Sequence, residues 1–178
     1  MRYDQLEHAI RAACDIAGDT ELLIFGSQSI LASFPDAPEA LRASIEVDVQ
    51  SKNRPEMTDF IDGALGQDSM FHSTHGFYVH GVSIEVATLP VGWSDRTIAV
   101  SDPVGTRGGT GQCLEAHDLA ASKLVAYREK DRVFVTTLLT EGLIDSQILV
   151  DRIRALPVTD EVRDRLMRWV EITIAGLA

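Results

Sequence analysis

The chain has 178 residues, of which 45% are hydrophobic, and a formal net charge of −11. This size predicts a substantial core, and no stretch approaches the roughly 20 consecutive apolar residues that span a bilayer. The acidic excess falls in residues 1–119, which excludes nucleic-acid binding by bulk charge alone. The polar N-terminus lacks a signal peptide's apolar centre, so we expect a cytoplasmic protein with free thiols at Cys14 and Cys113 and no membrane partner.

The first half of the chain alternates helical and strand patterns. Residues 4–17 carry apolar residues at helical spacing and end at Gly18, which predicts a helix. The apolar run 21–25 predicts a buried strand before a Gly-Ser turn and a short helix. The following elements are predicted next: a loop at 34–38, a strand at 44–50, a helix after Pro55 with Phe60 on its apolar side, strands at 77–80 and 83–88 forming a hairpin, and a strand at 97–100.

The rest of the chain has only helical patterns after a glycine-rich loop, Gly105–Gly111, which lacks the spacing of a P-loop. Asp118 is predicted to cap one long helix that continues toward Leu138, and two more helices are expected near 145–155 and 160–175. The predicted fold class is therefore α+β. A mixed β-sheet flanked by helices fills residues 1–113, and a helical lobe, residues 114–178, packs with it as one compact unit.

Acidic residues in strand patterns are the main chemical signal. Glu46 and Asp48 alternate with valines, so both point to one face of a strand, and such like charges repel unless a cation lies between them. A half-exposed strand is the simpler interpretation of the same alternation. Glu85 is a third acid between apolar neighbours. Gly26-Ser27 would let a phosphate approach the backbone, although alone it is an ordinary turn. Together these residues point to a divalent metal and a nucleoside triphosphate.

This order of residues resembles the signature of the nucleotidyltransferase superfamily with the DNA polymerase β-like fold. More closely, the chain resembles DUF6036-type nucleotidyltransferases, related to the AbiEii and MenT toxin-like enzymes. The helical segment 117–131 supports this, since the relatives carry a lysine, an arginine and an aspartate there at like spacing. The resemblance covers roughly residues 20–140, and it implies a nucleotidyltransferase-like sheet.

The resemblance also implies roles. Glu46 and Asp48 would hold Mg²⁺ or Mn²⁺, and Glu85 would share a second metal or accept the acceptor hydroxyl's proton. Gly26 and Ser27 would bind the β- and γ-phosphates of an NTP. Many relatives have aspartate in place of Glu46, whose extra methylene moves the carboxylate outward by about 1.5 Å.

Lys123 lies among apolar residues of the predicted long helix, where an amine is costly unless an anion meets it. It could instead extend its amine into solvent. The resemblance favours a triphosphate ligand, with Arg128 and Asp131 as candidates that orient Lys123 or the acceptor. A structural helix ion pair between Arg128 and Asp131, worth about 0.3 kcal/mol, is the alternative.

The resemblance implies NMP transfer to an RNA, protein or small-molecule hydroxyl, in a toxin–antitoxin or phage-defence system. The acceptor is then expected among tRNA 3′ ends and partner proteins, including a cognate toxin or antitoxin. A catalytically silent binding protein or antitoxin is the alternative function. His72, His75 and His80 are interpreted as surface residues and not as a zinc site. A local basic face for RNA would draw on these arginines: Arg152, Arg154, Arg163, Arg165 and Arg168.

Overall fold

The computed structural model describes residues 1–177 and divides the chain into two compact units. The first unit contains Met1–Val86 and Thr97–Glu115, and the second contains Ala87–Arg96 and the described residues from Ala116 onward. The sequence-based boundary after residue 113 did not anticipate that the segment Ala87–Arg96 groups with the C-terminal helices. Within residues 1–177, no helix combines the length and apolar character needed to cross a membrane.

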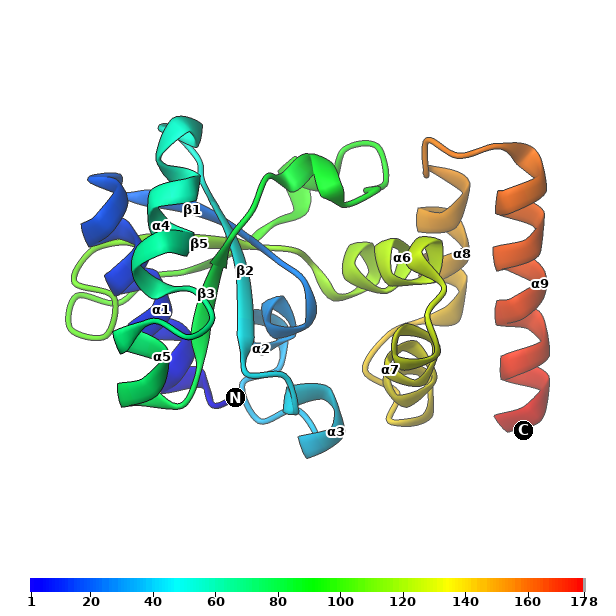
Figure 1. The fold of residues 1–178 in the computed structure, drawn as a ribbon. Coiled ribbons are helices and arrows are strands. Elements are labelled where there is room, and N and C mark those ends of the chain that lie inside the picture. Colours follow the sequence, from blue (N-terminus) through cyan, green and yellow to red (C-terminus); the bar gives the residue numbers. More distant parts are fainter. Residues whose placement is uncertain (178) are drawn as a thin grey trace. The chain divides into compact units, whose positions relative to one another are not determined.

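The first unit is built on a five-stranded mixed sheet with the order β3-β2-β1-β5-β4 (Figure 1). β1 pairs antiparallel with β2 and parallel with β5, while β2 pairs parallel with β3 and β4 antiparallel with β5. This sheet and its helices confirm the predicted α+β class. The strands are β1 Glu21–Phe25, β2 Glu46–Ser51, β3 Tyr78–Gly81, β4 Ile98–Val100 and β5 Thr110–Cys113.

Helices α1, α4 and α5 lie on one side of this sheet (Figure 1). Helix α1 buries the apolar face that the sequence predicts and ends at Gly18, whose φ of 59° is left-handed, a conformation that glycine adopts without steric cost. The helices of this unit are α1 Tyr3–Ala17, α2 Ile30–Ser33, α3 Glu39–Arg42, α4 Thr58–Leu65 and α5 Met70–His75, with 3₁₀ turns η1 Ser27–Ser29, η2 Pro55–Met57 and η3 Ile84–Val86.

Close contact with α4 identifies the covered face of the sheet. Gly81 pairs with Val49, and a Cβ at Gly81 would lie 2.1 Å from the backbone oxygen of Thr58 in α4. Because side chains alternate between the two faces of a strand, Val47 and Val49 point toward α4 and are fully buried. The residues that alternate with these valines along β2, Glu46 and Asp48, therefore point to the opposite face.

Several predicted elements of this unit are wrong. The hairpin of strands 77–80 and 83–88 does not form, because β3 pairs in parallel with β2 and the chain then makes the 3₁₀ turn Ile84–Val86. The last residues of the predicted glycine-rich loop belong to β5, where Gly111 lets the strand approach Ile10 of α1. Phe60, placed on the apolar side of its helix by the sequence, is 63% exposed.

The second unit contains four helices and the 3₁₀ turn η4 Trp93–Arg96: α6 Ala116–Ala126, α7 Glu129–Thr140, α8 Ser146–Arg154 and α9 Asp160–Leu177. The single long helix predicted through residues 118–138 is wrong, because the chain breaks at Tyr127, which has a φ of 54°. The Tyr127 ring has the guanidinium of Arg132 at 5.0 Å and that of Arg165 at 4.8 Å from its centroid. Cation–π contacts with these two guanidinium groups stabilise the Tyr127 ring at the break between the helices.

A buried carboxylate ties the segment Ala87–Arg96 to the helices of this unit. Asp118 is fully buried and accepts hydrogen bonds of 2.8 Å from both Nε and Nη2 of Arg96, while Nε of Arg152 lies 3.2 Å from it. Helix α6 begins at Ala116, so Asp118 lies within its first turn and is not the predicted cap. A buried carboxylate is tolerated only when it is paired, as it is here.

Candidate active site

Two carboxylates project from the face of β2 opposite α4. Glu46 and Asp48 alternate with the buried Val47 and Val49, and their side chains are 35% and 23% exposed. The structure therefore brings the two predicted metal-binding acids together on a surface that solvent can reach.

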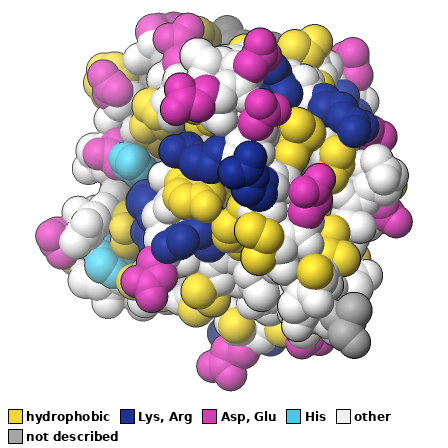
Figure 2. All heavy atoms as spheres, turned by 90° about the vertical axis from the view of Figure 1, so that its right-hand side faces the viewer, with side chains coloured by type: hydrophobic (Ala, Val, Ile, Leu, Met, Phe, Trp, Pro, Cys, Tyr) yellow, Lys and Arg dark blue, Asp and Glu magenta, His cyan; other side chains and the backbone are white. Residues whose placement is uncertain are grey.

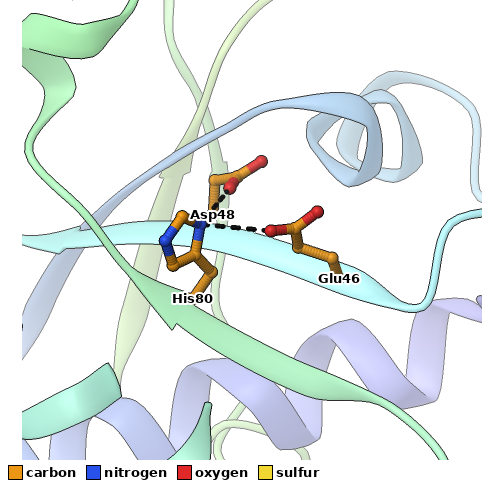
Figure 3. Close-up of side chains that lie close together, drawn as sticks. All are labelled: Glu46, Asp48 and His80. Carbon is orange, nitrogen blue, oxygen red and sulfur yellow. Dashed lines mark hydrogen bonds and ion pairs between the residues drawn. The ribbon is translucent and has the colours of Figure 1, made fainter. Parts of the chain in front are cut away.

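The parallel pairing of β2 with β3 adds a histidine to these acids. His80 lies opposite Asp48 in the register, and its Nδ1 is 3.0 Å from Oδ1 of Asp48 and 3.1 Å from Oε1 of Glu46 (Figure 3). Each of the three side chains offers a ligand atom, and these atoms lie within 4.8 Å of one another. Two carboxylate oxygens and an imidazole nitrogen form a donor set that suits a divalent cation.

The Gly26 turn borders this cluster. Phe25, the last residue of β1, pairs with Asp48, so the turn begins beside that carboxylate. Gly26 has a φ of 76° and a ψ of −170°, a region open essentially to glycine alone, and a Cβ there would lie 2.0 Å from Oδ2 of Asp48. The helical segment after it is short, with three residues in η1 and four in α2. Gly26 thus makes room for the Asp48 carboxylate, and Ser27 follows directly.

Tyr78 supports the cluster from β3. It pairs with Glu46 in the strand register and forms a side-chain hydrogen bond with it. Burial raises the pKa of Tyr78, and the negative charges of Glu46 and Asp48 raise it further. Hydrogen bonds to ligating carboxylates are a common way in which metal sites hold their ligands in place.

Glu85, the third predicted acid, does not join this cluster. It lies on the 3₁₀ turn Ile84–Val86 with an exposed side chain, and its backbone N–H donates to the Ser83 hydroxyl at 3.3 Å. Sequence reasoning placed Glu85 on a strand and missed His80. The only local signal was the strand pattern around Val79, because the pairing of β3 with β2 joins residues more than 30 positions apart.

Lys123 forms a buried ion pair within the second unit. Its Nζ lies 3.4 Å from Oδ1 of Asp131 and 4.5 Å from the centroid of the Phe134 ring, and its side chain is 10% exposed. The alternative of an amine extended into solvent is therefore wrong. Arg128 donates to the same carboxylate through Nε at 2.6 Å and Nη2 at 3.2 Å.

The Asp131 carboxylate is fully buried. Burial by itself would raise the pKa of Asp131, but the hydrogen bond from Arg128 and the charge of Lys123 together hold the pKa below its ordinary value. The structure thus brings Lys123, Arg128 and Asp131 together as one ionic group.

Arginines gather on α8 and α9 of the second unit. Figure 2 shows Lys and Arg side chains near the middle of the face that includes α9, among hydrophobic side chains and with acidic ones around them. Three of the five arginines of the predicted basic face pair with acids: Arg152 with Asp118, Arg154 with Asp151, and Arg163 with Asp160. These ion pairs reduce the positive charge available to a polyanion.

Comparison with known proteins assigns the chain to a family. No curated protein and no solved structure matches the chain. A family model described as "nucleotidyltransferase of unknown function" (DUF6036) matches residues 2–173, which covers nearly all of both units and every residue of the cluster on β2 and β3. The chain therefore belongs to the DUF6036 family.

Proposed function

We propose that this protein is a metal-dependent nucleotidyltransferase that moves an NMP from an NTP to a hydroxyl group. The observation that carries the proposal is the convergence of Glu46, Asp48 and the Gly26 turn at one point of the sheet, in a chain that matches a nucleotidyltransferase family along almost its whole length. The alternative, that β2 is only a half-exposed strand, does not explain why Gly26 leaves room for the Asp48 carboxylate where a Cβ would collide with it.

The reaction exchanges a phosphoanhydride bond of the NTP for a phosphoester bond to the acceptor. The acceptor oxygen forms a bond to the α-phosphorus, the bond from that phosphorus to the β-phosphate oxygen breaks, and pyrophosphate leaves with the electron pair. The acceptor hydroxyl loses its proton to a base. A divalent ion held by Glu46 and Asp48 would supply charge neutralisation for the triphosphate and a template for in-line displacement.

Further residues are proposed to bind the phosphates of the NTP and to accept the proton of the acceptor hydroxyl. Gly26 and Ser27 are proposed to bind the β- and γ-phosphates, since the turn that they form begins beside Asp48. Glu85, exposed on its turn, is proposed as the base for the acceptor proton. Lys123 is proposed to bind a phosphate, with Asp131 and Arg128 holding its amine in place.

The acceptor class is the finer part of the proposal. An acceptor hydroxyl on a tRNA 3′ end, a partner protein or a small molecule fits the same chemistry. The net charge of −11 and the paired arginines favour a protein or small-molecule acceptor over RNA. A cytoplasmic setting in a toxin–antitoxin or phage-defence system, with kinship to AbiEii and MenT-like enzymes, completes the proposal.

A labelling assay tests this function. The full chain is incubated with Mg²⁺ or Mn²⁺, each of the four α-labelled NTPs, and total tRNA or cell lysate as acceptor. The Asp48→Asn variant removes one carboxylate charge at the cluster, and Asp59→Asn removes one at an exposed position of α4 as the matched control.

Label entering RNA, protein or a small molecule with the wild type and Asp59→Asn, but not with Asp48→Asn, would establish nucleotidyl transfer and name the acceptor class. Absence of transfer with all four nucleotides and both metals, from protein that still binds NTP, would overturn the proposal. That outcome would favour the catalytically silent binding protein.

A further inference from the structure

We infer that the imidazole of His80 is the third protein ligand of the metal site, and that it makes the site prefer a first-row transition-metal ion over Mg²⁺. The inference rests on the proposed function only in taking Glu46 and Asp48 to bind a divalent cation. It differs from the sequence-based expectation, in which a third carboxylate, Glu85, completes the site.

The contacts of His80 point its Nδ1 at both acids. Nδ1 lies 3.0 Å from a carboxylate oxygen of Asp48 and 3.1 Å from one of Glu46, so a single ring nitrogen faces both groups (Figure 3). The three ligand atoms lie within 4.8 Å of one another, a spacing that leaves room for an ion between them. Such an ion would replace the two contacts of Nδ1 with metal–ligand bonds.

The backbone holds His80 in this place. The strand pairing sets it directly beside Asp48, and the next residue, Gly81, packs against the backbone of Thr58 and Asp62 in α4. Because Gly81 meets α4 on one face of the sheet, the His80 side chain points to the opposite face, where the two acids lie. A ligand on paired strands is more rigidly placed than one on a loop.

The chemistry of the donors predicts the preference. Mg²⁺ is a hard ion that prefers carboxylate and water oxygens, whereas imidazole nitrogen is a better ligand for first-row transition metals. A third carboxylate would have made the site an all-oxygen one. With His80 in that position, the site gains affinity for transition-metal ions and offers Mg²⁺ one carboxylate fewer.

Mn²⁺ is the probe that tests the inference, since its electron spin reports on directly bonded nitrogen. Electron spin echo envelope modulation of Mn²⁺ bound to the wild type is expected to show ¹⁴N coupling. His80→Gln removes the imidazole, while His75→Gln removes an exposed histidine elsewhere and Glu85→Gln removes the competing third ligand. Calorimetric titration with Mn²⁺ and with Mg²⁺ gives the affinities of all four proteins.

The inference expects the ¹⁴N coupling in the wild type, His75→Gln and Glu85→Gln, and its loss in His80→Gln. Mn²⁺ affinity should fall by about tenfold or more in His80→Gln, and Mg²⁺ affinity by much less. As a second variant, His80→Asp restores an all-oxygen site and should shift the Mn²⁺-to-Mg²⁺ affinity ratio toward Mg²⁺ by about tenfold.

Coupling retained in His80→Gln, equal losses for both ions, or a larger Mn²⁺ loss in Glu85→Gln would overturn the inference. Absence of Mn²⁺ binding to the wild type would overturn it as well. None of these measurements reads transfer, so a chain that binds Mn²⁺ through His80 but transfers no label would contradict the proposed function alone.

Discussion

The carboxylate of Asp48 lies so close to Gly26 that no side chain fits at position 26. A Cβ there would lie 2.0 Å from Oδ2 of Asp48 and 3.0 Å from its Cγ. The turn after β1 and the acidic strand β2 are therefore one structural feature, although 22 positions separate them in the sequence.

Gly26→Ala should displace the Asp48 carboxylate and strain the backbone. We expect a loss of about 1–3 kcal/mol in the free energy of unfolding, from the glycine-only dihedral angles, together with weaker Mn²⁺ binding. Gly63→Ala is the matched control, because nothing lies within 4 Å of its added Cβ and it sits in helix α4. That control should gain about 0.5–1 kcal/mol. Urea unfolding and calorimetry measure both, and unchanged Mn²⁺ affinity in Gly26→Ala would contradict the assigned role.

Glu46→Asp should weaken Mn²⁺ binding at the proposed metal site even though it keeps a carboxylate at this position. Glu46 pairs with Tyr78, two residue pairs away from the Asp48–His80 pair, and its longer side chain brings the carboxylate to 3.1 Å from the imidazole. Shortening it by about 1.5 Å removes that reach, and Mn²⁺ affinity should fall by about tenfold. Calorimetry measures this; an Mn²⁺ affinity equal to or higher than that of the wild type would show that Glu46 does not contribute through its length.

Asp19→Asn should reveal a stability term that depends on pH. The Asp19 carboxylate accepts hydrogen bonds from the Ser51 hydroxyl at 2.7 Å and from the backbone and side-chain N–H groups of Asn53 at 2.8 and 2.9 Å. Burial by itself would raise the pKa of Asp19, but these bonds outweigh it and hold the pKa well below its ordinary value.

A lowered pKa stabilises the folded state above the unfolded carboxyl value of about 3.9, and this contribution is lost as the pH falls through the folded value. The difference in unfolding free energy between the wild type and Asp19→Asn should be about 1.5–3 kcal/mol at pH 7 and shrink steadily below pH 4. Urea unfolding between pH 7 and pH 3 checks this, with the exposed Asp59→Asn as control. A difference that stays constant with pH would sink the assignment.

Asp118→Ala should be among the most destabilising changes in the second unit. It removes the buried carboxylate that pairs with both Arg96 and Arg152, and breaking a buried ion pair from one side costs about 3–5 kcal/mol. Asp151→Ala breaks the exposed pair with Arg154 and should change stability by less than about 0.5 kcal/mol. Thermal and urea unfolding compare the two; similar small losses in both variants would contradict a structural role for Asp118.

Lys123→Met should separate the phosphate role of the lysine from its pairing with Asp131. If the amine binds a triphosphate, affinity for a non-hydrolysable NTP analogue should fall by about tenfold or more, which corresponds to 1.4 kcal/mol. Mn²⁺ affinity should not change. Isothermal titration with the analogue measures the effect, beside urea unfolding. Unchanged NTP affinity with lowered stability would instead assign the amine to the ion pair with Asp131 alone.

Local sequence patterns were sufficient to predict several elements and the two acids on β2. Helical and strand periodicity correctly indicated α1, β1 and β2, because the side chains that set these periods pack against the nearest core. The alternation of β2 was sufficient to place Glu46 and Asp48 on one face, and Gly26-Ser27 marked the turn at the end of β1.

Long-range contacts set which residue completes the cluster and where the predicted long helix is divided into α6 and α7. The parallel pairing of β3 with β2 brings His80 to Asp48 from a distant part of the chain, and local patterns carry no information about strand register. Likewise, no glycine or proline marks Tyr127. The contacts of its ring with Arg132 and Arg165, and the burial of Asp131 against Lys123, are the long-range interactions found at the break between α6 and α7.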